Sequence, residues 1–246
     1  MYILKWTVAA AFFLAPAFAG PLLLVLPNGQ TSTLGNDNSG SLAGSIPNLD
    51  IQDIWLKDQF ASVGGSLLIN QFAFRLMPGT GSINATATSF SADMSTTSFG
   101  PSTMSTTFAA NRGADYTQVA SGTGTVWSSP GCTALVTCPF DMVFTLSTPF
   151  LYNPSSGNLL LELHSTAYNG VGTGEFDVEN YFSAAGSKVG ELVNFTSGSP
   201  TGVLEFSDSV TRIGYTLVTP EPDSYALSLC GLGALVALRR VRKLTH

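Results

Sequence analysis

The sequence predicts an all-β protein, a jelly-roll-like two-sheet β-sandwich between an N-terminal signal peptide and a short C-terminal transmembrane helix. Three observations predict the sandwich. Apolar and polar residues alternate through many short runs, clusters of Gly, Pro, Asn and Ser separate these runs, and Ser and Thr are abundant where a cytosolic domain would use Lys and Glu. Together they indicate many short strands, each with one wet face.

The first 19 residues have the pattern of a signal peptide. Lys5 precedes an apolar segment, and residues 17–19 (Ala-Phe-Ala) supply small residues for a cleavage site. Pro16 disfavours the alternative of a buried N-terminal helix. We expect the mature chain to start at Gly20 and residues 20–219 to form one secreted domain.

Period-2 alternation predicts strands over Ser66–Met77, Phe140–Leu146, Asn158–His164, Gly174–Phe182, Thr201–Phe206 and Val210–Val218. The inward faces of the first four are expected to carry Leu68, Phe72, Phe74 and Leu76; Phe140, Met142, Phe144 and Leu146; Leu159, Leu161 and Leu163; and Phe176, Val178 and Phe182.

Three further segments have less regular patterns. Leu49–Ala61 is the one helical candidate, and Gly29–Ser45 is expected to be a loop-rich entry segment. Thr86–Thr107 is rich in Ser and Thr, which is typical of a mucin-like stalk or of a hairpin. Its scarce Pro and its neighbouring Phe side chains favour a hairpin with the turn at Gly100-Pro101 and an exposed Thr-rich face.

Cys132 and Cys138 are expected to form a disulfide. They lie close in the sequence, and an oxidising compartment favours their pairing. A zinc site needs about four ligands, commonly Cys and His. Because His164 is the only histidine before the tail, we predict no metal and no cofactor.

A possible carboxylate cluster is the only catalytic candidate. Glu175, Asp177 and Glu179 project from one face of a predicted strand, and Glu162 is a possible neighbour. Such a group is explained by simple solvation, by a Ca²⁺ site or by a hydrolase dyad. The oxygen-rich segment 35–40 resembles a calcium loop but lacks the downstream Glu. No catalytic residue is assigned, since His164 is expected on a polar strand face.

Charge excludes one class of partner. Residues 20–219 contain five Lys and Arg against fourteen Asp and Glu, a net charge of −9. Nucleic-acid binding needs a basic face, and five scattered cations do not make one.

The C-terminal segment 220–246 has three parts. Pro220, Glu221 and Pro222 form a Pro-Glu-Pro triplet, an apolar run covers 225–238, and four cations follow: Arg239, Arg240, Arg242 and Lys243. The apolar run is shorter than the roughly 20 residues of a full membrane span. The basic end should stay cytoplasmic, which leaves the domain outside.

This tail resembles the PEP-CTERM sorting signal of bacterial envelope proteins. The triplet, Tyr225, the small residues of the apolar run and the basic end match its pattern, whereas Cys230 departs from it and is either a buried apolar residue or an anchor site. The resemblance covers about a tenth of the chain. It implies recognition by an exosortase, transient residence in the inner membrane and cleavage near the triplet.

We therefore expect an exported, non-enzymatic surface or extracellular-matrix protein of a bacterial envelope, with exopolysaccharide as a candidate contact. Two alternatives from other classes stay open. One is a secreted carbohydrate-active hydrolase that uses the carboxylate cluster, and the other is a calcium-stabilised adhesin.

Overall fold

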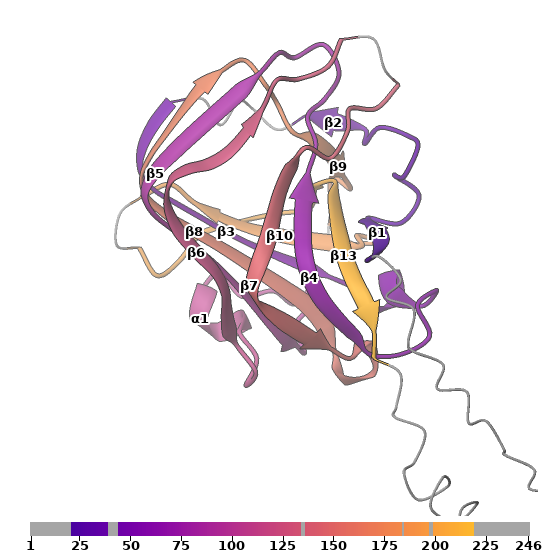
Figure 1. Ribbon diagram of the computed structural model, residues 1–246. Helices are drawn as coiled ribbons and strands as arrows, with labels where there is room; N and C mark the ends of the chain where they lie inside the picture. Colours follow the sequence, from indigo (N-terminus) through magenta and orange to yellow (C-terminus); the bar gives the residue numbers. More distant parts are fainter. Residues whose placement is uncertain (1–20, 39–43, 134–135, 184, 197–198, 219–246) are drawn as a thin grey trace, which may run out of the picture.

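The computed structural model describes residues 21–38, 44–133, 136–183, 185–196 and 199–218 (Figure 1). The predicted signal peptide and the C-terminal segment from residue 220 lie outside these residues. Within the described ranges, no helix combines the length and the apolar character that crossing a bilayer requires.

The described residues form three antiparallel sheets, which confirms the all-β prediction. The four-stranded sheet has the order β1 (Leu22–Leu26), β13 (Thr211–Leu217), β4 (Leu67–Phe74), β7 (Met142–Tyr152). The six-stranded sheet has the order β11 (Val203–Glu205), β10 (Val189–Asn194), β3 (Gly44–Trp55), β8 (Asn158–Gly172), β5 (Ile83–Thr97), β6 (Thr117–Ser129). A small third sheet, which was not predicted, has the order β12 (Ser207–Ser209), β9 (Asp177–Asn180), β2 (Asp37–Asn38). The helical segments are η1 (Lys57–Phe60), α1 (Phe108–Asn111) and η2 (Pro154–Ser156).

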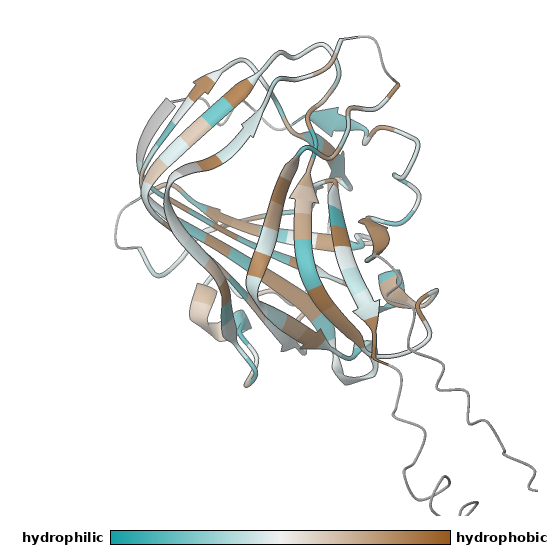
Figure 2. Ribbon diagram, in the orientation of Figure 1, coloured by the Kyte–Doolittle hydropathy of each residue, from teal (hydrophilic) through white to brown (hydrophobic). Residues whose placement is uncertain are grey.

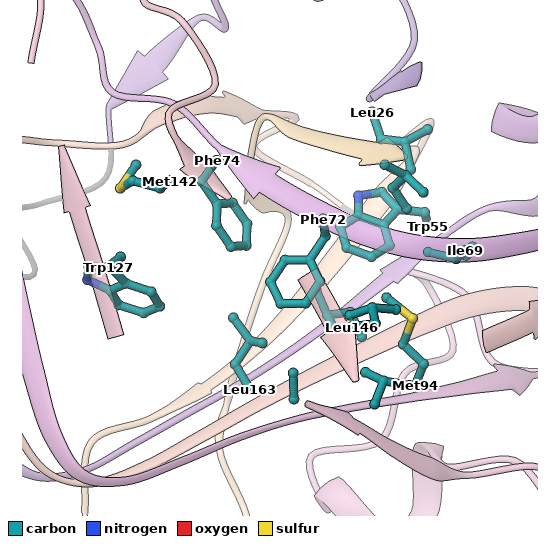
Figure 3. Close-up of a cluster of buried hydrophobic side chains, with 14 of the residues drawn as sticks. Leu26, Trp55, Ile69, Phe72, Phe74, Met94, Trp127, Met142, Leu146 and Leu163 are labelled. Carbon is teal, nitrogen blue, oxygen red and sulfur yellow. The ribbon is translucent and has the colours of Figure 1, made fainter. Parts of the chain in front are cut away.

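The main hydrophobic core combines side chains of the two larger sheets (Figure 3). Ile69 and Phe72 come from the four-stranded sheet, and Met94 and Leu163 come from the six-stranded sheet. Brown and pale or teal residues alternate along several strands in Figure 2, as strands with one buried face require. Burial of each large apolar side chain contributes about 1.5–3 kcal/mol, so this core is the main source of stability.

Strand β8 follows its predicted pattern. Leu159, Leu161 and Leu163 are buried in the main core, on one side of the strand. Leu160 points to the other side and joins a second cluster with Phe108 and neighbouring residues. The central strand is therefore covered on both faces where the segment around α1 crosses the outside of the six-stranded sheet.

Strand β7 confirms its predicted alternation in part. Met142 and Leu146 are buried, and Phe144 stacks on Phe72 with 4.7 Å between ring centroids. Phe140 lies before the strand and is only half-buried. The guanidinium of Arg75 lies 4.9 Å from its ring centroid, so this aromatic ring contacts a cation.

The helix predicted over Leu49–Ala61 is wrong. Residues up to Trp55 belong to β3, and only the short η1 follows. Leu49 and Trp55 are buried in the main core, whereas Ile54 joins the second cluster. Because both faces of β3 are covered, apolar residues occur at odd and even positions, and this mixture imitates a helical spacing.

Two predicted inward faces need correction. In β4 the register shifts between Ile69 and Gln71, so Leu67 and Ile69 are buried before the shift and Phe72 after it, while Leu68 is half-buried. A bulge reverses which residues face the core. Phe182 is 76% exposed because the chain leaves β9 before reaching it.

The hairpin predicted within Thr86–Thr107 is wrong. Residues up to Thr97 belong to β5, which pairs from Ile83 to Met94 with β6, a strand that lies beyond the predicted segment. Gly100 and Pro101 belong to a long connection that contains α1 rather than a tight turn. Phe108 is buried in the second cluster, and this apolar contact holds the connection on the sheet.

The predicted disulfide between Cys132 and Cys138 is confirmed. Their Cα atoms lie 5.6 Å apart, within the usual range for a disulfide. Cys138 is buried, and the carbonyl of Cys132 accepts a hydrogen bond from the Gly79 amide. The short loop is thereby attached to the segment after β4.

A buried ion pair joins the small sheet to the rest of the domain. Arg75 Nε donates to Asp177 Oδ2 at 2.7 Å, and both side chains are almost fully buried. Arg75 Nη2 also donates to the carbonyls of Gln30 and Thr33. The amide of Gly35 donates to Asp177 Oδ1, and a Cβ there would lie only 2.0 Å from the Val178 carbonyl oxygen. The entry segment, β4 and β9 therefore meet at this pair.

We predict that Asp177→Asn lowers the free energy of unfolding by about 3–5 kcal/mol, because it leaves the Arg75 charge buried without a counter-charge. Urea unfolding followed by tryptophan fluorescence measures the effect. The matched control is Lys188→Ala, which removes the exposed Lys188–Asp58 pair and should cost less than about 1 kcal/mol. Equal midpoints for Asp177→Asn and the control would contradict this role.

Candidate functional site

Glu162 is held by other side chains on the outer face of the six-stranded sheet. Arg112 donates to both of its carboxylate oxygens, at 2.9 and 2.6 Å, and Gln52 Nε2 donates at 2.9 Å. Asn111 in turn donates to Gln52. Glu162 is therefore the centre of a satisfied polar network rather than a free acid or base.

The other three predicted cluster residues lie in or beside the small sheet, not in the sheet of Glu162. Asp177 is the partner of Arg75, Gln30 donates to Glu179, and Asn38 donates to Glu175. Burial raises the pKa of Glu179, and a hydrogen bond from the Asn36 backbone opposes this rise. The four carboxylates are thus divided between two places and have different partners.

His164 pairs with Asp50 on the outer face of the six-stranded sheet. The hydrogen bond from His164 Nδ1 to the Asp50 carboxylate raises the pKa of His164 despite an opposing effect of burial. Two hollows, of about 370 and 440 Å³, meet at His164. Arg112 and Glu162 line the first, and hydroxyl-bearing residues of β5 and β6 line the second, so this face offers many hydrogen-bonding groups.

A different set of carboxylates converges inside the domain. Asp53 of β3, Glu191 of β10 and Asp208 of β12 form what we call the acidic cluster, and each offers a carboxylate oxygen within 4.8 Å of the others. Asp53 and Asp208 are 2% and 1% exposed, whereas Glu191 is partly exposed. A pocket of about 340 Å³ reaches Glu191 and Asp208.

Strand pairing explains why these acids meet. Asp53 and Glu191 are direct cross-strand partners, and Glu205 of β11 is the next partner of Glu191. Like charges opposite one another on a sheet repel. Asp208 adds a third carboxyl from the small sheet, where it pairs with Glu179 of β9. The arrangement therefore concentrates negative charge between two sheets.

The surroundings disfavour ionisation of the acidic cluster. Burial, followed by the neighbouring carboxylates, raises the pKa of Asp53, Glu191 and Asp208 well above the usual range. Glu191 is the one member of the acidic cluster that is partly exposed. The Trp55 indole and the Ser209 backbone oppose the rise in the pKa of Asp208, but neither forms a hydrogen bond of normal geometry with its carboxylate.

Several polar atoms at the acidic cluster are buried without a hydrogen-bond partner. They are both carboxylate oxygens of Asp208, Oδ1 of Asp53 and Nε1 of Trp55. None of the ion pairs formed by the described residues includes Asp53, Glu191 or Asp208. Carboxyls in this setting can share protons or can ligate a cation, and both would remove the charge imbalance.

Sequence patterns do not identify the acidic cluster. Glu191 and Asp208 lie in short segments where an isolated acid usually marks a solvent-exposed position. Asp53 lies in the segment predicted as a helix. Had that segment been predicted as a strand, Asp53 would share a face with Ile51 and Trp55, which is the one signal that it points inward.

Comparison with known proteins leaves the fold and site to be interpreted directly. The chain matches no protein-family model, and a search of curated proteins gives no match.

The acidic cluster predicts that, with divalent cations chelated, stability falls as pH rises. The native state retains protons above the ordinary pKa values of 3.8 for Asp and 4.5 for Glu, so its stability is greatest below those values. The stabilisation that these retained protons provide is lost as pH rises through the raised pKa values of the native state. One retained proton corresponds to a slope of about 1.4 kcal/mol per pH unit.

Asp208→Asn, which mimics the protonated side chain, should flatten this dependence. Urea unfolding in chelator between the usual carboxyl range and mild alkali measures the difference between the two proteins. If the variant and the unmodified protein have parallel profiles, Asp208 does not retain a proton in the folded state.

Proposed function

We propose that this protein is an exported bacterial surface or extracellular-matrix protein with a non-enzymatic, jelly-roll-like β-sandwich body and a PEP-CTERM sorting tail. The tail motif supports sorting by an exosortase after transient residence in the inner membrane. The disulfide between Cys132 and Cys138 is consistent with an oxidising compartment outside the cytoplasm.

The observation that carries this proposal is the Pro-Glu-Pro tail at 220–222, and the pairing of the first and last described strands suits a body that is tethered through this tail. Leu22 of β1 pairs with Tyr215 of β13, so the start of β1 lies beside the end of β13. β13 begins two residues after Ser209 of the small sheet and runs away from it (Figure 1). At roughly 3.3 Å per residue, its end lies about 20 Å from its start. A body tethered after β13 would hold the small sheet away from the tether.

The partners of the ionisable groups support a non-enzymatic role. Glu162 is occupied by Arg112, Asp177 by Arg75, and His164 by Asp50. A hydrolase dyad instead needs two carboxyls that flank a substrate bond, at least one with access to it. In the acidic cluster, Asp53 and Asp208 are too deeply buried to flank a substrate.

The outer face of the six-stranded sheet is the proposed contact for exopolysaccharide. The hollow beside His164 is lined by Ser89, Ser91, Gln118, Ser121 and Thr123, among others. These side chains supply hydroxyl and amide groups that can exchange hydrogen bonds with sugar hydroxyls. Residues 86–97 of the Ser- and Thr-rich segment that was expected to expose such a face belong to β5, which carries part of this hollow.

Intact mass spectrometry of the protein from native envelope fractions tests the proposal. We expect a species that starts at Gly20, ends near Pro220–Pro222 and is two hydrogens lighter than the reduced chain because of the disulfide. In a triple variant with Pro220→Ala, Glu221→Gln and Pro222→Ala, the C-terminal segment should remain attached. A native mass that extends to His246 would contradict sorting by cleavage.

A further inference from the structure

We propose that Asp53, Glu191 and Asp208 form a calcium-binding site that joins the small sheet to the six-stranded sheet. This site differs from both calcium candidates suggested by the sequence, the 35–40 segment and the Glu175–Glu179 strand. All three residues belong to the described part of the chain, and binding of an ion there does not require sorting of the protein.

The spacing of the ligand atoms suits a single ion. Ca²⁺ binds oxygen at roughly 2.3–2.6 Å, so ligands on opposite sides of the ion lie about 5 Å apart. The three carboxylate oxygens lie within 4.8 Å of one another, which places them within one such coordination sphere. Each comes from a different strand, β3, β10 or β12, so the backbone fixes their positions.

The unpartnered state of Asp208 points independently to a ligand. Its side chain is buried, and neither carboxylate oxygen has a hydrogen-bond partner. Oδ1 of Asp53 is in the same condition. A buried acceptor without a partner destabilises the folded state, and more strongly when it is charged. A cation between these oxygens removes that destabilisation at both residues.

The same fold shows how a buried carboxylate is neutralised when the chain supplies the cation. Asp177 receives Arg75 Nε on one oxygen and the Gly35 amide on the other. The acidic cluster is also buried, yet no Arg, Lys or His among the described residues forms an ion pair with it. A cation from outside the chain would supply the missing charge.

The donor set selects the type of cation. All three side chains are carboxylates, and no Cys or His belongs to the group. Hard cations prefer oxygen ligands, whereas zinc and copper favour nitrogen and sulfur. Mg²⁺ demands a near-ideal octahedron and retains several waters, while Ca²⁺ accepts irregular arrangements of protein oxygens. Two acids that are almost fully buried favour Ca²⁺ over Mg²⁺.

The pocket of about 340 Å³ provides a path for the ion. Glu205 lies on its wall, is exposed, and is the cross-strand partner of Glu191. Exposure therefore decreases from Glu205 through Glu191 to Asp208. Ser207 and Ser209 flank Asp208 and also line the pocket, so further oxygen atoms are within the same wall.

Thermal unfolding of the full chain in mild detergent, first stripped with chelator, tests the proposal. Adding Ca²⁺ to about a hundredfold over its dissociation constant should raise Tm by roughly 5–10 °C, because only the folded state assembles the site. Asp208→Asn should abolish the shift. The matched control is Asp115→Asn, since Asp115 is an exposed acid that accepts from the Thr96 amide, as an Asn carbonyl also can; it should keep the full shift.

Terbium luminescence gives a second readout that survives if Asp208→Asn fails to fold. Tb³⁺ substitutes for Ca²⁺, and Trp55 is close enough to Asp208 to sensitise its emission. We expect tryptophan-excited emission from the unmodified protein that Ca²⁺ displaces. Absence of both a calcium shift and displaceable emission would overturn the site and leave a proton-sharing cluster. A Tm shift with Mg²⁺ but not with Ca²⁺ would overturn the choice of ion.

Discussion

The domain depends on one buried ion pair, Arg75 with Asp177. Arg75 follows β4 of the four-stranded sheet, and Asp177 begins β9 of the small sheet. Main-chain bonds from the Asp177 amide to the Arg75 carbonyl and from the Val210 amide to the Asp177 carbonyl reinforce the junction. Because a buried pair becomes costly when one partner is lost, this contact fixes the position of β9 and, through strand pairing, of β12.

The position of β12 determines the chemistry of the pocket. Asp208 of β12 faces Asp53 and Glu191 of the six-stranded sheet, and it is this third carboxyl that turns a cross-strand acidic pair into a possible coordination sphere. The ion pair and the acidic cluster thus both contain buried carboxylates whose negative charge needs to be neutralised. One buried carboxylate is balanced by an arginine of the chain, and the other three require protons or a cation. A bound ion would add a second connection between the sheets.

Much of the fold follows from alternation, as Leu159, Leu161 and Leu163 show. Alternation fails to predict the strand or its buried face where a local contact overrides the two-residue period. Both faces of β3 are covered, so its pattern imitates a helix, and the shift after Ile69 reverses the inward face of β4. The acidic cluster could not be predicted, because an acid such as Asp208 has the same sequence pattern whether it faces water or a buried ligand. Strand pairing joins Asp53 to Glu191, and the packing of the small sheet brings Asp208 to them.

The most direct test of the account is a crystal structure of the protein grown with Ca²⁺, with anomalous scattering data collected to locate the ion. The proposed calcium site predicts one strong anomalous peak surrounded by oxygens of Asp53, Glu191 and Asp208, with ligand distances of about 2.3–2.6 Å. Well-defined density for all three carboxyls, with no peak between them and with contacts short enough for shared protons, would contradict it.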